Sequence, residues 1–229
     1  MGGSMGGVAL IGKVPSDPKP QGNLEKEDFI VELMATGNLT LSPKGMQLPG
    51  GQIRFYSFCP VEMEGFAQKY AEAIRTEKLC PDLIFAPTKE DLPLAAAVTQ
   101  ELGGGIDYYR PAQDGNLSLK GKQVLIVCDT MTAKVIEAAR SFKAGGVLIG
   151  CVVAFDPQER MERSDLSAIQ EFRKTFRHVP IHALARLADL VSVLVKTAPK
   201  SLNPGERAAL IGNILAQWGL NREDPNKKV

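Results

Sequence analysis

The chain has 229 residues, of which 44% are hydrophobic and 23% charged, a composition typical of one globular domain with extensions. Its 27 Lys+Arg and 26 Asp+Glu residues leave a net charge of +1, which argues against a general binder of nucleic acid or of membrane surfaces. No apolar run reaches the roughly 18 residues that a membrane-spanning helix needs.

The N-terminal third predicts a helix followed by a hairpin. Residues 1–23 are rich in Gly and Pro and read as a flexible lead or a non-native remnant. From Leu24 the apolar residues recur with helical spacing until Gly37, a glycine suited to ending a helix. Segments 39–41 and 52–58 alternate like two strands, and turn residues lie between them.

The rest of the chain alternates between helical patterns and short apolar strands. The expected helices occupy 61–78, 92–102, 134–146, 166–176 and 187–196. The expected strands occupy 82–87, 106–111, 122–130, 147–156 and 179–184. This order predicts an α/β fold with a doubly wound, mostly parallel sheet and helices on both faces. Ligands of such sheets bind at the carboxyl ends of the strands, here after Phe85, Tyr109, Val127 and Phe155.

The C-terminal segment 203–220 predicts one more helix, with Asn203 as its N-cap and Pro204 in its first turn. Its apolar stripe consists of Leu210, Ile214, Leu215 and Trp218. The stripe either packs on its own domain or contacts a partner with Trp218 as the anchor. The tail after this helix should be mobile.

The four cysteines are widely spaced, no CxxC pair is present, and two histidines are too few for a zinc pattern. Cys128 and Cys151 lie inside apolar runs, so we expect small buried side chains in a reducing intracellular compartment. The cytoplasm is favoured and an organelle stays open. The other two cysteines are Cys59 and Cys80.

Several strings resemble the orotate phosphoribosyltransferase family, over roughly Phe29 to Leu194. They include FIVELMATGNLTL, DLIFAPTKEDLPLAAAVTQEL, KGKQVLIVCDTMT, AFDPQER with LSAIQEF, and HALARLADLV. The resemblance implies a type I phosphoribosyltransferase fold at 24–198, with a small hood at about 24–60, and usually a homodimer. Residues 199–229 then form a C-terminal helix and tail.

The family binds 5-phosphoribosyl pyrophosphate (PRPP) on an acidic pair followed by a Gly-rich turn at a helix N-terminus. Here Asp129 and Thr132 match that motif, but the loop contains no glycine and is about three residues short. Lys134 could meet an anion electrostatically, or it is simply a solvated lysine of the first helical turn.

The family's pyrophosphate loop corresponds to residues 86–93. Lys89 lies one residue out of place, Glu90 stands where a lysine belongs, and Asp91 stands where a glycine belongs. These carboxylates repel pyrophosphate unless a cation intervenes. A weak Mg²⁺ site formed by Glu90, Asp91 and Asp129 is one alternative. A negatively charged helix N-terminus is the other.

The two remaining family motifs are also incomplete. In the mobile-loop segment 110–116 only Arg110 matches the family, and the segment reads equally well as a plain turn. In the orotate-binding stretch 156–160, Pro157 stands where the family has arginine and cannot donate a hydrogen bond. Arg160 and Arg163 are nearby and read as surface charges.

A hood aromatic pair is represented by Phe55-Tyr56, which also fits ordinary core packing. The main hypothesis is therefore a phosphoribosyltransferase-like protein with eroded sites, which is non-catalytic and serves as a structural, assembly or regulatory subunit. It predicts no cofactor and no catalytic residues. The alternatives are an active orotate phosphoribosyltransferase that uses Mg²⁺, and a binding module for another small ligand.

Overall fold

A computed structural model describes residues 21–47, 53–59, 63–105, 107–109, 119–141, 145–161, 164–197 and 202–219. Its helices are α1 (Gln21–Ala35), α2 (Met63–Thr76), α3 (Leu92–Glu101), α4 (Ala133–Ser141), α5 (Ala168–Thr175), α6 (Leu187–Lys196) and α7 (Pro204–Gly219). Its strands are β1 (Leu39–Gln47), β2 (Ile53–Phe58), β3 (Leu83–Phe85), β4 (Asp107–Tyr109), β5 (Gln123–Thr130), β6 (Val147–Asp156) and β7 (Ile181–Arg186). The order of elements agrees with the prediction throughout these ranges.

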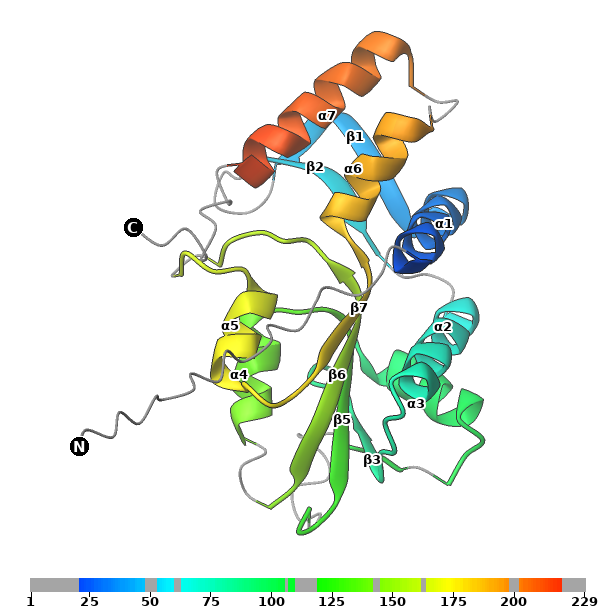
Figure 1. Ribbon diagram of the computed structural model, residues 1–229, viewed down its shortest axis with the longest axis vertical. Coiled ribbons are helices and arrows are strands. Elements are labelled where there is room, and N and C mark those ends of the chain that lie inside the picture. Colours follow the sequence, from blue (N-terminus) through cyan, green and yellow to red (C-terminus); the bar gives the residue numbers. More distant parts are fainter. Residues whose placement is uncertain are drawn as a thin grey trace, which may run out of the picture.

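Strands β3 to β7 form a parallel sheet in the order β4-β3-β5-β6-β7. Successive side chains of a strand point to opposite faces. On β5, Leu125 and Val127 pack into the core with α2 and α3, whereas Ile126 and Cys128 pack into the core with α4 and α5. Figure 1 shows these two helix pairs on opposite sides of the sheet. The predicted doubly wound α/β fold is confirmed.

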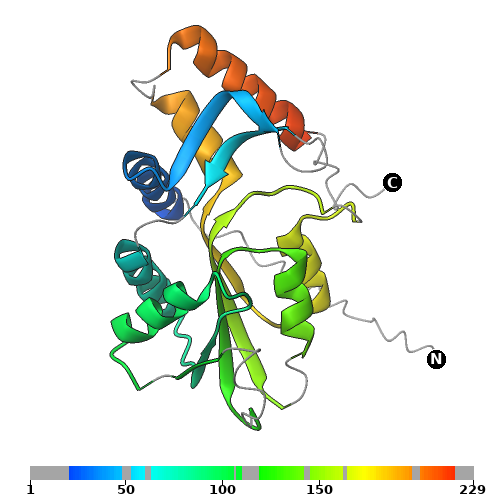
Figure 2. The same cartoon turned by 180° about the vertical axis from the view of Figure 1, so that it is seen from behind.

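The hood consists of the antiparallel pair β1 and β2. Strand β1 is longer than predicted, because the backbone stays extended through the expected turn residues, with an irregularity between Leu41 and Met46. Gly45 has a φ of +76°, which favours glycine, and a Cβ there would overlap the Ile53 side chain. Figure 2 shows α6 and α7 beside this pair.

The first and last helices refine the predicted boundaries. Helix α1 begins at Gln21, inside the segment 1–23 expected to be a lead, and Gly37 follows its end with a φ of +76°. Asn203 caps α7 as predicted, since its Oδ1 accepts the Glu206 amide at 2.9 Å. Leu210 and Ile214 are buried within the domain.

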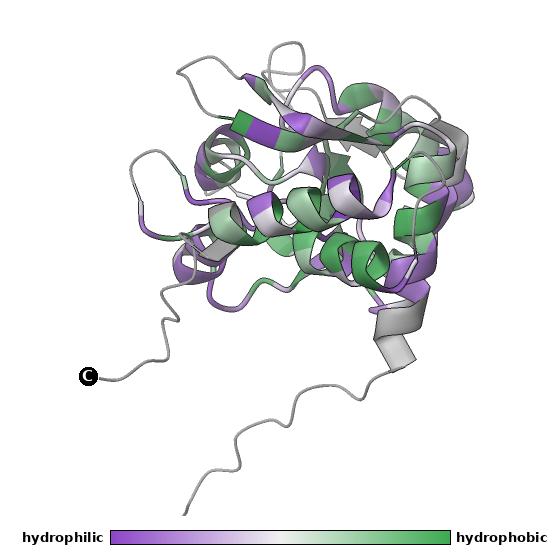
Figure 3. Cartoon of the chain, turned by 90° about the horizontal axis from the view of Figure 1, so that it is seen from above, coloured by the Kyte–Doolittle hydropathy of each residue, from purple (hydrophilic) through white to green (hydrophobic). Residues whose placement is uncertain are grey.

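Leu215 belongs to the same predicted apolar stripe, and its side chain is 41% exposed. The Trp218 side chain lies outside the described residues, and so does the predicted tail. In Figure 3, viewed from the α7 end, helices carry hydrophobic and hydrophilic sides as their periodicity predicts. Among the described helices, none is both long and apolar enough to cross a membrane.

Helix α5 begins with a capping box. Ser167 Oγ accepts the Gln170 amide at 3.3 Å, and Gln170 Oε1 accepts the Ser167 amide at 2.8 Å. We expect Ser167→Ala to lower the free energy of unfolding by about 1 kcal/mol, because the Gln170 amide loses its partner. Urea unfolding measures this, and Ser167→Thr, which keeps the hydroxyl, should retain most of the stability. An unchanged alanine variant would contradict the assigned cap.

Candidate functional site

Three loops meet at the carboxyl edge of the sheet, and the hood lies above them (Figure 1). They follow β3, β5 and β6, and ligands of parallel sheets bind at this edge. These loops contain the sequence-predicted residues at 88–91, 129–134 and 156–160. Arg110, Arg163 and the segment 111–116 lie outside the described residues, and the predictions about them stay untested.

Asp91 occupies the centre of the first loop and is 3% exposed. Its Oδ2 accepts hydrogen bonds from the Thr88 amide at 3.1 Å and the Thr88 hydroxyl at 2.7 Å. Its Oδ1 accepts the Asp129 amide at 3.1 Å. One buried carboxylate therefore joins the loop after β3 to the carboxyl end of β5.

Glu90 and Asp91 precede α3, which agrees with the predicted acidic helix N-terminus, but Asp91 also makes contacts outside that helix. Asp91 is at the N-cap position of α3, yet its side chain makes no capping hydrogen bond to that helix. The carboxylate instead accepts hydrogen bonds from the amides of Thr88 and Asp129. Lys89 and Glu90 differ from it, with side chains 87% and 67% exposed and an ion pair at 3.8 Å.

Two acidic groups lie close together at this point. Burial raises the pKa of Asp91 above its ordinary value. Burial, followed by the nearby Asp91 charge, raises the pKa of Asp129 to about 6, although a hydrogen bond from the Thr130 amide partly offsets the rise. The site disfavours additional negative charge for the same reason that it holds protons more tightly than an exposed aspartate does.

Thr132 and Lys134 lie at the start of α4, after the end of β5. Thr132 Oγ1 accepts the Val135 amide at 3.4 Å, so the hydroxyl caps the helix. Lys134 is exposed, as predicted for a first-turn lysine. Within the described ranges no three His, Cys, Asp or Glu residues are grouped to hold a metal ion. The Glu90 side chain is 67% exposed, and the weak metal prediction for Glu90, Asp91 and Asp129 stays a prediction.

The β6 loop is held from above by the hood. Glu159 Oε1 accepts Arg54 Nε at 3.0 Å, and its Oε2 accepts Arg54 Nη2 at 2.5 Å. The Tyr56 hydroxyl donates to Glu159 Oε1 at 2.6 Å. Three donors of β2 thus converge on one carboxylate of the loop after β6. Sequence reasoning missed this cluster, because 105 positions separate Arg54 from Glu159 and no local pattern links them.

The β6 loop also folds onto the start of α6. Gln158 adopts a φ of +53°, its amide donates to Asp156 Oδ1 at 2.9 Å, and its Oε1 accepts the Ala188 amide at 2.9 Å. Arg160 was expected as a free surface charge, but its side chain is only 30% exposed and its Nη1 lies 3.6 Å from Asp165 Oδ1. The short return of the chain to Ser167 explains its partial burial.

The aromatic residues of the hood pack on the end of β6. Tyr56 is 3% exposed and meets Phe155 edge to face, with ring centroids 5.6 Å apart. Phe58 stacks on Phe155 at 5.5 Å. Core packing, one of the two predicted roles of the Phe55-Tyr56 pair, is confirmed for Tyr56, whose hydroxyl is also engaged by Glu159.

The predicted burial of Cys128 and Cys151 is confirmed, and both are free thiols. A hydrogen bond with Cys151, followed by burial, raises the pKa of the Cys128 thiol well above its usual value. The Cys128 carbonyl accepts the buried Tyr70 hydroxyl at 2.7 Å. A nucleophilic role for Cys128 is disfavoured because the thiol stays protonated.

The sequence is similar to curated enzymes called orotate phosphoribosyltransferase. Orotate phosphoribosyltransferase 2 of Saccharomyces cerevisiae is 33% identical over 181 residues, which cover 69% of this chain and 77% of the yeast protein. The chain belongs to the orotate phosphoribosyltransferase family. The enzyme of Metarhizium anisopliae is 34% identical, and the match covers 56% of this chain and 65% of the fungal one. The chain thus spans just under two thirds of that relative's length. No family model matches the sequence.

Solved structures agree on the fold. Orotate phosphoribosyltransferase of Francisella tularensis has a TM-score of 0.64 at 20% identity, over 82% of this chain and 98% of that one. UMP synthase of Leishmania donovani has a TM-score of 0.61 at 19% identity, over 83% of this chain and 42% of that one. The fold is of the type I phosphoribosyltransferase kind, as the sequence motifs predict.

Proposed function

We propose that this orotate phosphoribosyltransferase-like protein is non-catalytic and acts as a structural, assembly or regulatory subunit. The proposal is carried by Asp91, whose buried carboxylate accepts hydrogen bonds from the Thr88 and Asp129 amides. Amides at the carboxyl edge of a parallel sheet are the groups that bind phosphate oxygens in phosphate-binding loops. In this chain the Asp91 carboxylate already accepts the hydrogen bonds of the Thr88 and Asp129 amides.

Electrostatics supports the same proposal. A pyrophosphate approaching these amides would have to displace Asp91 and would face Asp91 and Asp129 together. At an effective dielectric constant of about 20, two unit charges 4 Å apart repel by about 4 kcal/mol. The exposed Lys89 and Lys134 offset little of this repulsion, because ion pairs in solvent contribute only about 0–1 kcal/mol.

The hood contacts favour a structural role. Arg54, Tyr56 and Glu159 join the hood to the sheet, and α6 and α7 lie beside it. These contacts hold the hood in a fixed position on the sheet, so that its surface can bind a second copy of the chain or another subunit. We propose a homodimer or a protein assembly as its working state.

Catalysis is the competing proposal, and the curated names of the relatives favour it. Asp129 and Thr132 would then bind PRPP, and Mg²⁺ would be the cofactor. A binding module for a different small ligand is the third proposal.

The deciding experiment measures PRPP binding and product formation with the full chain. Isothermal titration with PRPP and Mg²⁺ should give no saturable heat, and orotate with PRPP should release no pyrophosphate above background. The yeast relative serves as the positive control under identical conditions. Turnover comparable to the yeast enzyme would overturn the non-catalytic proposal.

A further inference from the structure

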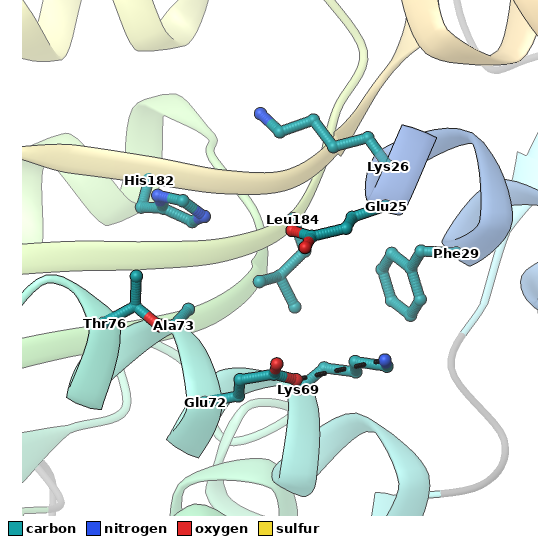
Figure 4. A pocket seen from close by; sticks show the side chains of 9 residues that line it. All are labelled: Glu25, Lys26, Phe29, Lys69, Glu72, Ala73, Thr76, His182 and Leu184. Carbon is teal, nitrogen blue, oxygen red and sulfur yellow. Dashed lines mark ion pairs between the residues drawn. The ribbon is translucent and has the colours of Figure 1, made fainter. Parts of the chain in front are cut away.

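A cleft lies between α1 and α2 and over the edge strand β7. Its volume is about 260 Å³, comparable to the lower end of small-molecule sites. Phe29 of α1 and Leu184 of β7 form an apolar floor, and Phe29 meets Phe66 of α2 edge to face at 5.8 Å. Figure 4 shows charged side chains reaching over this floor from both helices.

The charges around the cleft are balanced. Two lysines, Lys26 and Lys69, and two glutamates, Glu25 and Glu72, line it, together with His182. Burial lowers the pKa of His182, so at neutral pH the imidazole is uncharged and the lining has no net charge. A site of this kind complements a ligand that carries one charge of each sign.

Two of the charged groups are available to such a ligand. Lys69 pairs loosely with Glu72 at 4.0 Å. Among the described residues no ion pair within 4.0 Å involves Lys26 or Glu25, although the carboxylates of Asp156 and Asp189 attract the Lys26 ammonium group electrostatically. Lys26 is half-buried, and burial lowers the pKa of its ammonium group. A half-buried ammonium group without an acceptor gains more from an incoming anion than an exposed one does.

The positions of these groups separate the two charges. In Figure 4 the Lys26 side chain extends towards the His182 side of the cleft, and the Glu25 carboxylate lies over Leu184. Phe29 lies opposite His182. We propose that this cleft binds a small zwitterion with an apolar group, its carboxylate on Lys26, its ammonium group on Glu25, and its apolar group on Phe29 and Leu184.

Three size-matched probes test the proposal by isothermal titration of the full chain. Leucine carries both charges, 4-methylpentanoate carries only the carboxylate, and 3-methylbutylamine carries only the ammonium group. Leucine should bind at least about ten-fold more tightly than either single-charge probe, since each lost charge removes one charge-assisted hydrogen bond. No leucine binding, or equal binding of 4-methylpentanoate, would overturn the proposal.

Variants place the binding in this cleft. Lys26→Met and Glu25→Gln should each weaken leucine binding about ten-fold or more. Neither residue has a described hydrogen-bond partner, so both variants should keep the wild-type melting temperature. Lys174→Met, an exposed lysine of α5, is the matched control and should bind leucine normally. Unchanged affinity in Lys26→Met would contradict the assigned site. PRPP binding or its absence leaves this inference unaffected, because the cleft and the carboxyl-edge loops are lined by different residues.

Discussion

Glu159→Ala should lower the free energy of unfolding by about 3 kcal/mol. The substitution leaves the Arg54 guanidinium, which is half-buried, and the Tyr56 hydroxyl, which is nearly buried, without the carboxylate that accepts from both. Removing one partner of a hydrogen-bonded charge cluster costs more than the cluster itself contributes, because the remaining groups are left desolvated. Urea unfolding at neutral pH measures the change.

A double-mutant cycle separates the ion pair from local packing. Arg54→Met alone should destabilise the protein, but in the Glu159→Ala background it should cost much less, giving a coupling of about 1–2 kcal/mol. Glu137→Ala removes an exposed acid of α4 and should change stability by no more than about 0.5 kcal/mol. Additive effects of the Arg54 and Glu159 substitutions would show that the contact between hood and loop does not stabilise the fold.

Asp129→Asn should stabilise the protein by about 2 kcal/mol at pH 7.5 and have little effect at pH 4. The pKa of Asp129 is raised to about 6 in the folded state from an ordinary value of 3.8, so the folded protein retains a proton that the unfolded chain releases. Stability therefore falls as pH rises between those values, and above about pH 6 the full cost of the buried charge is present. The full shift corresponds to about 3 kcal/mol, and partial solvent exposure reduces it.

The asparagine variant avoids this cost because it is never charged, and its Oδ1 can still accept the Thr130 amide. Asp28→Asn, an exposed acid of α1, is the control and should show no comparable pH dependence. Chemical denaturation at several pH values between 4 and 8 gives the comparison. A stability difference between variant and wild type that does not change with pH would contradict the burial of Asp129 beside Asp91.

The functional consequence of the first loop depends on the same pair of residues. From the sequence alone, Asp91 is predicted only as an acidic residue at the start of α3. The fold brings the end of β5 next to Asp91, and the Asp91 carboxylate then accepts a hydrogen bond from the Asp129 amide. The proposal of a non-catalytic role rests on this contact between two loops and not on the motif alone.

The sequence by itself determined the order of helices and strands, the doubly wound sheet and the N-terminal hairpin, because apolar periodicity and turn residues act over a few positions. It also placed the candidate loops at the carboxyl edge. The tertiary structure decided how those loops are used. The Asp91–Asp129 contact, the Arg54–Glu159 pair and the cleft between α1 and α2 join residues far apart along the chain. Such contacts follow from packing and from the need of buried polar groups for partners, which no local pattern encodes.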